Sequence, residues 1–328
     1  MYSLRQYLQT LEDPHGLTRR LGEASLCRDD RGRAIYSTGN SEAVFRIRCQ
    51  GRTCALRCYF RPMRRLAAID GDRYLPRELY LYTTPEQGRW VDAVLCDWVE
   101  GQTLHAAIAR AAESGDGERL AQLSEAFDRL ALELVTDDRA HGDLKPENLI
   151  LTPDGRLVPI DLDASFLPEF AGETSSEIGT AAFQHPDRTA AHFDASLDDY
   201  PAALIATALH ALRLDPTLYA RHRCDGLLFT PQRIAADPAL QEVLALFERH
   251  GMAAEYRLAR LLLSPTLRLP DLPQLLRRLT AADEPPAQTP ELFVENGLWG
   301  YRCGDRPAIP PLYDEGFDFS EGLAAVRL

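Results

Sequence analysis

Residues 141–148 read HGDLKPEN, and the sequence patterns on either side of this stretch differ in kind. Before it, apolar residues from Leu120 to Leu134 recur at the period of 3.6 that predicts one apolar stripe of a long helix. After it, two short apolar runs flank the turn at residues 153–155 and predict a pair of short strands. The polar stretch is therefore expected to form a loop between a helix and a small β-structure.

The rest of the chain divides into a β-rich region and a helical region. Two strand-like runs flank Gln50-Gly51 and predict a hairpin, and helical periodicity replaces strand patterns beyond residue 101. Five segments follow: an N-terminal helical extension, a β-rich region, a helical region, a Pro-rich linker and a last short segment. They cover residues 1–33, 34–101, 102–281, 282–290 and 291–328.

The composition is that of a globular protein, with 45% hydrophobic and 26% charged residues. Its 328 residues exceed what one compact core usually fills. The net charge of −13 would repel nucleic acid and anionic lipid. The first residues lack the apolar run of a signal peptide, and the longest apolar stretch, 202–212, is too short for a bilayer. We therefore expect a cytoplasmic protein that binds neither nucleic acid nor membranes.

Lys145 is the only lysine in the sequence, because the other 35 basic residues are arginines. Arginine and lysine serve equally well as solvated surface charges, but they differ where a slim point charge on a flexible stem is needed. The one position that keeps lysine is therefore expected to need it chemically.

The stretch 141–148 resembles the HRDLKPEN catalytic loop of the protein kinase superfamily, with Gly142 at the arginine position as in many bacterial kinases and small-molecule phosphotransferases. In kinases the loop Asp accepts the proton of the attacking hydroxyl, a lysine lies near the γ-phosphate, and the Asn holds magnesium. The resemblance assigns these roles to Asp143, Lys145 and Asn148. It implies an α+β fold of the bilobal kinase type, with a small β-rich N-lobe and a larger helical C-lobe.

Further motifs extend the resemblance along the helical region. Asp161 resembles the Asp of the DFG segment, which binds magnesium. Asp163, two residues later, has two interpretations: it joins the metal ligands or it caps the turn. The second is preferred.

Two later motifs resemble structural parts of the kinase fold. Asp198 resembles the Asp that ties down the kinase catalytic loop. Asp187 and Arg268 resemble the acid and the arginine that pair at the end of the activation segment, which predicts a partly buried ion pair between them.

The β-rich region follows the kinase pattern less closely. Arg57 stands where kinases have the lysine that contacts the α- and β-phosphates, so it is either tolerated by an altered pocket or no longer catalytic. The helix glutamate that pairs with that lysine has no clear counterpart, which leaves Asp70 and Glu78 as candidates. Glu42, at the third glycine position of the nucleotide-covering loop, would repel phosphate.

Other residues of this region are expected to contact a nucleotide. Gly39 and Val44 match positions of the nucleotide-covering loop. Asp97 and Val99 resemble the linker between kinase lobes, whose backbone groups face adenine; the alternative is an ordinary strand that ends in a glycine turn.

Residues 291–328 resemble one unit of the bacterial WG repeat, through Trp299-Gly300 and the segments that follow it. Such units are short strands that need stacked neighbours to bury their faces, and arrays of them generally serve as protein-binding surfaces. We therefore expect the first unit of a longer array that binds a protein substrate or partner. The alternative is a single hairpin appended to the helical region.

Together the resemblances imply a protein kinase of the Ser/Thr type that uses ATP and Mg²⁺. A pseudokinase scaffold is the first alternative, because Arg57 and Glu42 disturb the nucleotide site. A small-molecule phosphotransferase is the second, because those enzymes share the HGD triplet.

Overall fold

The computed structural model describes residues 1–39, 41–280, 291–295, 297–303, 306–317 and 324–327. The chain divides into two compact units, residues 1–275 and 276–328. The predicted linker, residues 282–290, lies outside the described residues. The first unit is an α+β structure that contains all the residues discussed below as a candidate site.

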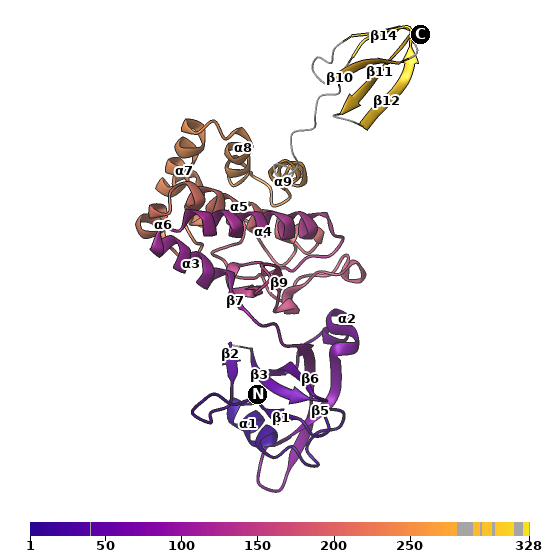
Figure 1. The fold of residues 1–328 in the computed structure, drawn as a ribbon. Helices are drawn as coiled ribbons and strands as arrows, with labels where there is room; N and C mark the ends of the chain where they lie inside the picture. Colours follow the sequence, from indigo (N-terminus) through magenta and orange to yellow (C-terminus); the bar gives the residue numbers. More distant parts are fainter. Residues whose placement is uncertain (40, 281–290, 296, 304–305, 318–323, 328) are drawn as a thin grey trace. The chain divides into compact units, whose positions relative to one another are not determined.

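The first unit contains a curled antiparallel sheet of six strands in the order β1-β3-β4-β6-β5, with β2 paired to β3 (Figure 1). The strands are β1 (Ser25–Leu26), β2 (Tyr36–Thr38), β3 (Glu42–Cys49), β4 (Arg52–Tyr59), β5 (Tyr74–Tyr82) and β6 (Gly88–Asp97). The predicted hairpin is confirmed: β3 and β4 pair on either side of Gln50 and Gly51, with Val44 opposite Arg57. Both turn residues have positive φ, as a tight two-residue hairpin requires.

The N-terminal segment packs against this sheet. The predicted first helix is confirmed as α1 (Leu4–Glu12), and its Tyr7 and Leu11 belong to the same buried cluster as the inward side chains of the sheet. Glu78 of β5 is fully buried, and its carboxylate accepts hydrogen bonds of 2.8–3.0 Å from the backbone N–H groups of residues 19–21. This carboxylate therefore fixes the N-terminal chain to the sheet.

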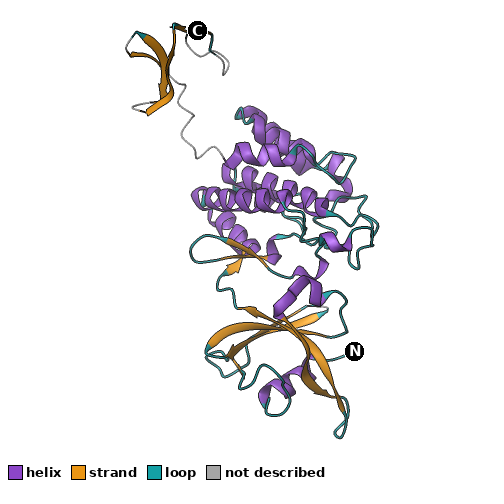
Figure 2. Ribbon diagram, turned by 90° about the vertical axis from the view of Figure 1, so that its right-hand side faces the viewer, coloured by secondary structure: helices purple, strands orange, loops and turns teal. Residues whose placement is uncertain are grey.

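Most of the helices lie at the other end of the first unit from the six-stranded sheet (Figure 2). They are α3 (Leu104–Ser114), α4 (Gly117–Thr136), α5 (Asp199–Leu214), α6 (Thr217–His222), α7 (Pro238–Arg249), α8 (Ala253–Leu261) and α9 (Leu272–Thr280). Residues 199–212 of α5 are all buried, as expected for a helix that is apolar on most sides, and α4 packs along it. In the part of the chain that the structure describes, no helix is long and apolar enough to cross a membrane.

Short elements connect the sheet to the helices. A five-residue helix, α2 (Leu66–Asp70), lies between β4 and β5. A small antiparallel sheet consists of β7 (Gln102–Thr103), β8 (Leu149–Leu151) and β9 (Leu157–Pro159), and the last two are the predicted short strands. The loop 141–148 therefore runs from the end of α4 to the start of β8, as predicted.

The second unit is a small β-structure. Strands β10 (Glu291–Glu295), β11 (Leu298–Cys303) and β12 (Arg306–Tyr313) form an antiparallel sheet, and β13 (Glu315–Gly316) pairs with β14 (Val326–Arg327). Tyr301 is 1% exposed, and its hydroxyl donates to the backbone O of Phe317 at 2.9 Å. Of the predicted repeat motif, Asn296 and residues 318–323 lie outside the described residues.

Candidate functional site

A cleft of about 1060 Å³ is lined by residues of both the large sheet and the helical region. Of the predicted site residues, Gly39, Val44, Lys145, Asn148 and Asp161 line it. The first two come from the β2–β3 connection and from β3, and the other three follow α4 or β9. The fold therefore brings residues more than 100 positions apart in sequence to one cavity.

The loop 141–148 is anchored from beneath through its backbone. Asp198, which is fully buried at the start of α5, accepts hydrogen bonds from the N–H groups of His141 at 2.6 Å and Gly142 at 3.0 Å. The predicted tie between Asp198 and the loop is confirmed. Gly142 has a φ of +78°, and a Cβ at this position would lie 2.2 Å from the backbone O of Ala164. This close approach and the positive φ explain why glycine occupies this position.

Four residues meet at the centre of the loop, and we refer to Asp143, Lys145, Asn148 and Thr180 as the loop site. Lys145 Nζ lies 3.0 Å from Asp143 Oδ2 and donates to Thr180 Oγ1 at 2.7 Å. The backbone N–H of Thr180 donates to Asp143 Oδ1 at 2.5 Å. Asn148 Nδ2 donates to the backbone O of Asp143 at 3.0 Å and to its Oδ2 at 3.3 Å.

The loop site combines a fixed carboxylate with a partly accessible ammonium group. The side chains of Asp143 and Lys145 are 16% and 21% exposed. A carboxylate oriented by several donors can accept a proton from a hydroxyl, and the adjacent ammonium can bind an anionic group. The sequence motifs give Thr180 no role. The preceding residue, Gly179, is the signal that could have pointed to it, because a Cβ added there would lie only 2.7 Å from the backbone O of Gly142.

Arg57 lies at the centre of a second group, the charge cluster, which consists of Glu42, Arg57, Asp161 and Asp163. The Arg57 guanidinium is 3.0 Å from a carboxylate oxygen of each of the three acids. The Arg57 side chain is 7% exposed, whereas that of Asp161 is 42% exposed and faces the cleft. The cluster therefore joins β3 and β4 to the segment after β9.

Burial sets the charge state of this cluster. Desolvation raises the pKa of Glu42 to about 7, although the Arg57 charge lowers it, and the carboxylates of Asp163 and Asp161 raise it further. Desolvation likewise raises the pKa of Asp163 to about 6, again opposed by Arg57. Desolvation acts to lower the pKa of Arg57, but the surrounding acids raise it above its ordinary value, so the guanidinium stays charged.

The predicted partners of Arg57 are wrong. Asp70 pairs with Arg73 at 3.1 Å, and Glu78 is engaged by the backbone of residues 19–21. Arg57 pairs with Glu42 instead. Val44 is opposite Arg57 in the hairpin, and Glu42 lies two residues from Val44 on the same face of β3, within reach of the guanidinium. The preferred interpretation of Asp163 as a turn cap is also wrong, since its Oδ1 contacts Arg57 and accepts from the hydroxyl of Tyr59 at 3.3 Å.

The oxygen ligands that a divalent cation would need are present beside the loop site. Carboxylate oxygens of Glu42, Asp161 and Asp163 lie within 4.8 Å of one another. Asn148 is connected to this group, because its backbone O accepts from the N–H of Ile160, the residue before Asp161, at 2.9 Å. Carboxylates and amide oxygens are the donors that Mg²⁺ prefers, so the residues fit this ion.

Three predicted nucleotide contacts, Arg57, Asp97 and Val99, are not among the residues that line the described cleft. Asp97 ends β6, and its side chain is 84% exposed and 3.8 Å from Arg52. Val99 is half-buried just beyond this strand. The backbone contacts to adenine that the sequence assigned to Asp97 and Val99 therefore stay a prediction.

The predicted ion pair between Asp187 and Arg268 is wrong. Both side chains are exposed, and no ion pair between them occurs in the described part of the chain. The segment of Arg268 is held instead through the next residue, because Asp199 accepts from the backbone N–H of Leu269 at 2.7 Å. A buried carboxylate that accepts a backbone N–H fixes the chain without a paired arginine.

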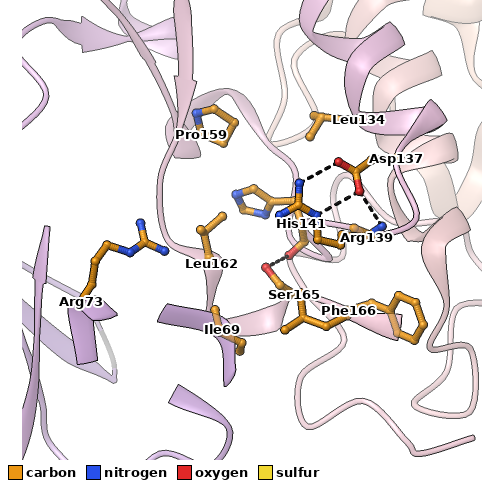
Figure 3. Close-up of a pocket in the computed structure, with 12 residues that line it drawn as sticks. Ile69, Arg73, Leu134, Asp137, Arg139, His141, Pro159, Leu162, Ser165 and Phe166 are labelled. Atoms are coloured by element: carbon orange, nitrogen blue, oxygen red, sulfur yellow. Dashed lines mark hydrogen bonds and ion pairs between the residues drawn. The ribbon is translucent and has the colours of Figure 1, made fainter. Parts of the chain in front are cut away.

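A second cavity, of about 290 Å³, lies behind the loop (Figure 3). Ile69 of α2 lines it together with apolar residues of the helical region, including Leu134, Leu162 and Phe166. It borders the loop directly, because His141 also lines it. The helix α2 has five residues, and none of them is a glutamate.

The chain matches no model of a known protein family, and no curated protein matches it.

Proposed function

We propose that the first unit is a phosphotransferase of the protein kinase type, which uses ATP and Mg²⁺ to phosphorylate a protein hydroxyl. In this proposal residues 34–101 form the N-lobe of a bilobal kinase-like fold and residues 102–281 form the C-lobe. The observation that carries it is the loop site: Asp143 accepts from Thr180 and Asn148 and contacts the only lysine of the chain.

The proposed chemistry uses the loop site directly. Asp143 accepts the proton of the attacking hydroxyl, because its carboxylate is oriented by Thr180, Lys145 and Asn148, all of which line the cleft. Lys145 binds the oxygens of the transferred phosphoryl group, where negative charge is spread in the transition state. Thr180 holds Lys145 and Asp143 at a fixed separation, which removes orientational freedom before the reaction.

The metal would be held by Asp161 and Asn148, with Glu42 and Asp163 close enough to contribute. When bound, Mg²⁺ would neutralise charge on the phosphates of ATP. Gly39 and Val44 would cover the nucleotide, since both line the cleft. In this arrangement Arg57 orients Asp161 and is not required to reach the phosphates itself.

A scaffold without catalytic activity is the second candidate, and the charge cluster favours it. Arg57 lies 3.0 Å from each of the three acids that would face a metal ion, so it competes with the ion for the same oxygens. In a scaffold, the second unit would provide the binding function. We also propose that residues 291–328 bind a protein partner as a WG-repeat unit, by resemblance of their sequence.

Two measurements separate these functions. The first is thermal unfolding with ATP, with and without Mg²⁺, because a ligand at about 100 times its dissociation constant stabilises by roughly 2.7 kcal/mol. A kinase-type enzyme shows a Mg²⁺-dependent increase in melting temperature, and a scaffold shows none.

The second measurement is the fate of labelled γ-phosphate after incubation with proteins or with small alcohols and amino sugars. Label on protein supports the kinase proposal, and label only on small molecules supports a small-molecule phosphotransferase. Absence of transfer to every acceptor contradicts both enzymatic proposals.

A further inference from the structure

The interface between α4 and α5 contains buried polar side chains that the proposed function does not use. The two helices pack against each other within the helical region (Figure 1). Ser124 and Asp128 lie on α4, Thr207 and His210 lie on α5, and each of these residues is at most 2% exposed. None of the four is among the residues that line the cleft. A role for them has to be sought in the helices themselves.

Two of these residues form a buried pair that ties the helices together. His210 Nε2 lies 2.8 Å from Asp128 Oδ2, and both side chains are 3% exposed. On its other side His210 Nδ1 lies 3.9 Å from Glu255 of α8. Glu255 in turn accepts from Arg213 Nη2 at 2.9 Å. The pair of Asp128 and His210 therefore joins α4 to α5, and the neighbouring ion pair joins α5 to α8.

The polar groups of this interface do not serve stability well. Ser124 Oγ, Thr207 Oγ1 and Asp128 Oδ1 are buried atoms that have no hydrogen-bond partner in the described part of the chain. Each such atom has lost its water without replacement, and apolar residues of similar size would avoid this cost. A buried hydrogen bond instead gives direction. Apolar side chains can pack in more than one register, whereas an N–H and a carboxylate oxygen meet in only one.

The register of α4 on α5 determines where the loop 141–148 lies. The helix α4 ends at Thr136 and leads into the loop, and Asp198 directly precedes α5. Asp198 accepts from the N–H groups of His141 at 2.6 Å and Gly142 at 3.0 Å. A slide of one helix by a single residue is a shift of about 1.5 Å, which is enough to break hydrogen bonds of this length.

We propose that Asp128 and His210 are a positioning pair, whose buried hydrogen bond fixes the register of α4 on α5 and thereby holds the loop site in place. The pair acts through the two helices and not by contact with the reacting groups. This inference goes beyond the proposed function, because it concerns the geometry of the loop whatever reaction the loop supports.

Hydrogen exchange of the full chain, measured by mass spectrometry, tests the proposal. In the variant Asp128→Leu/His210→Leu an apolar contact replaces the pair, and Glu255 keeps Arg213 as its partner. We expect an equal or higher melting temperature, because apolar packing replaces a buried polar pair. Backbone N–H groups in peptides covering 138–148 should nevertheless exchange about tenfold faster, because the loop opens more often when the register is not fixed.

Two matched variants locate the effect. Asp128→Asn/His210→Gln keeps a side-chain N–H opposite an oxygen and should keep the slow exchange of the loop. Ser124→Ala/Thr207→Val removes the two unpaired hydroxyls from the same interface and should leave the exchange of the loop unchanged. A kinetic measurement adds to this comparison but rests on the proposed function: phosphate transfer by the leucine variant should slow, with the KM for ATP unchanged.

Unchanged exchange of the loop in the leucine variant overturns the proposal. So does failure of that variant to fold, because the pair would then be needed for stability and not for register. An equal increase in exchange in Ser124→Ala/Thr207→Val also overturns it. Absence of phosphate transfer by the unaltered chain contradicts the proposed function but leaves the exchange comparison intact, so the two failures can be told apart.

Discussion

The loop site and the charge cluster face the same cleft but are held in different ways. The loop site depends on backbone hydrogen bonds: Asp198 fixes His141 and Gly142, and the N–H of Thr180 fixes Asp143. The charge cluster depends on the balance between Arg57 and three acids. The backbone of the loop should therefore persist when Lys145 or the Thr180 side chain is changed, whereas the charge cluster should be strongly destabilised when Arg57 is removed.

The largest expected effect is on the charge cluster. Arg57→Ala leaves three carboxylates close together in a largely buried place and should lower the free energy of unfolding by about 3–5 kcal/mol. Urea denaturation measures it. Arg52→Ala on the same strand is the control, since its side chain is 69% exposed and it should cost less than about 1 kcal/mol. Similar losses of unfolding free energy in both variants would show that Arg57 does not hold the charge cluster together.

The second prediction concerns the support beneath the loop site. Desolvation raises the pKa of Asp199 to about 7, opposed by the N–H of Leu269 and assisted by Asp198, from an ordinary value of 3.8. An acid with a raised pKa in the folded state contributes stability below pH 4 that is lost as the pH rises towards 7. Asp199 alone should therefore lower the free energy of unfolding by about 1 kcal/mol per pH unit within this window, and Glu42 and Asp163, whose pKa values are raised as well, should add to the slope.

Denaturation from pH 4 to 7 checks this slope, with Asp199→Asn as the comparison. The amide keeps an oxygen for the N–H of Leu269 and does not titrate, so the variant should show a shallower dependence on pH. Parallel curves for the two proteins would show that Asp199 does not cause the slope.

The third prediction concerns positioning within the loop site. Thr180→Ala removes the oxygen that holds Lys145 and should lower the rate of phosphate transfer by roughly tenfold to a hundredfold. Stability should change little, because the Thr180 side chain is only half-buried. Thr180→Ser keeps the hydroxyl and should retain most of the rate. An equal loss of rate in both variants would show that the Thr180 hydroxyl does not position Lys145.

The smallest expected effect is at a contact between the sheet and the helical region. Arg65 donates to the backbone O of Thr174 at 3.2 Å, and its guanidinium lies 4.8 Å from the ring centroid of Phe170. Arg65→Ala should cost about 1 kcal/mol of unfolding free energy. Arg64→Ala, at an exposed neighbour, is the control, and an equal change in both would assign the effect to net charge alone.

The same contrast explains what could be predicted from the sequence. Three of the four residues of the loop site are local: Asp143, Lys145 and Asn148 lie within six consecutive residues, so one motif predicts all three, whereas Thr180 comes from a later segment. The tie from Asp198 follows from a second motif and is confirmed.

The charge cluster is not local, and its residues come from three segments. The relation between Glu42 and Arg57 was nevertheless present in the sequence, because a tight turn at Gln50-Gly51 fixes the register of the hairpin and places Val44 opposite Arg57. The motif by itself indicates only that Glu42 would repel phosphate.

The predicted ion pair between Asp187 and Arg268 is wrong for a different reason. A motif gives the order of residues but not their exposure, and both side chains are exposed in this fold. The buried hydrogen bond of Asp199 to Leu269 depends on how α5 meets a distant loop, which no local pattern specifies.

The most direct test of the central claim is a single-turnover measurement of γ-phosphate transfer by the unaltered chain and by Asp143→Asn, at saturating ATP and Mg²⁺. If Asp143 takes the hydroxyl proton, the unaltered chain transfers phosphate and the variant is slower by about 10²–10⁴-fold, with an unchanged free energy of unfolding. Equal rates in the two proteins, or no transfer by the unaltered chain to any acceptor, would contradict the claim.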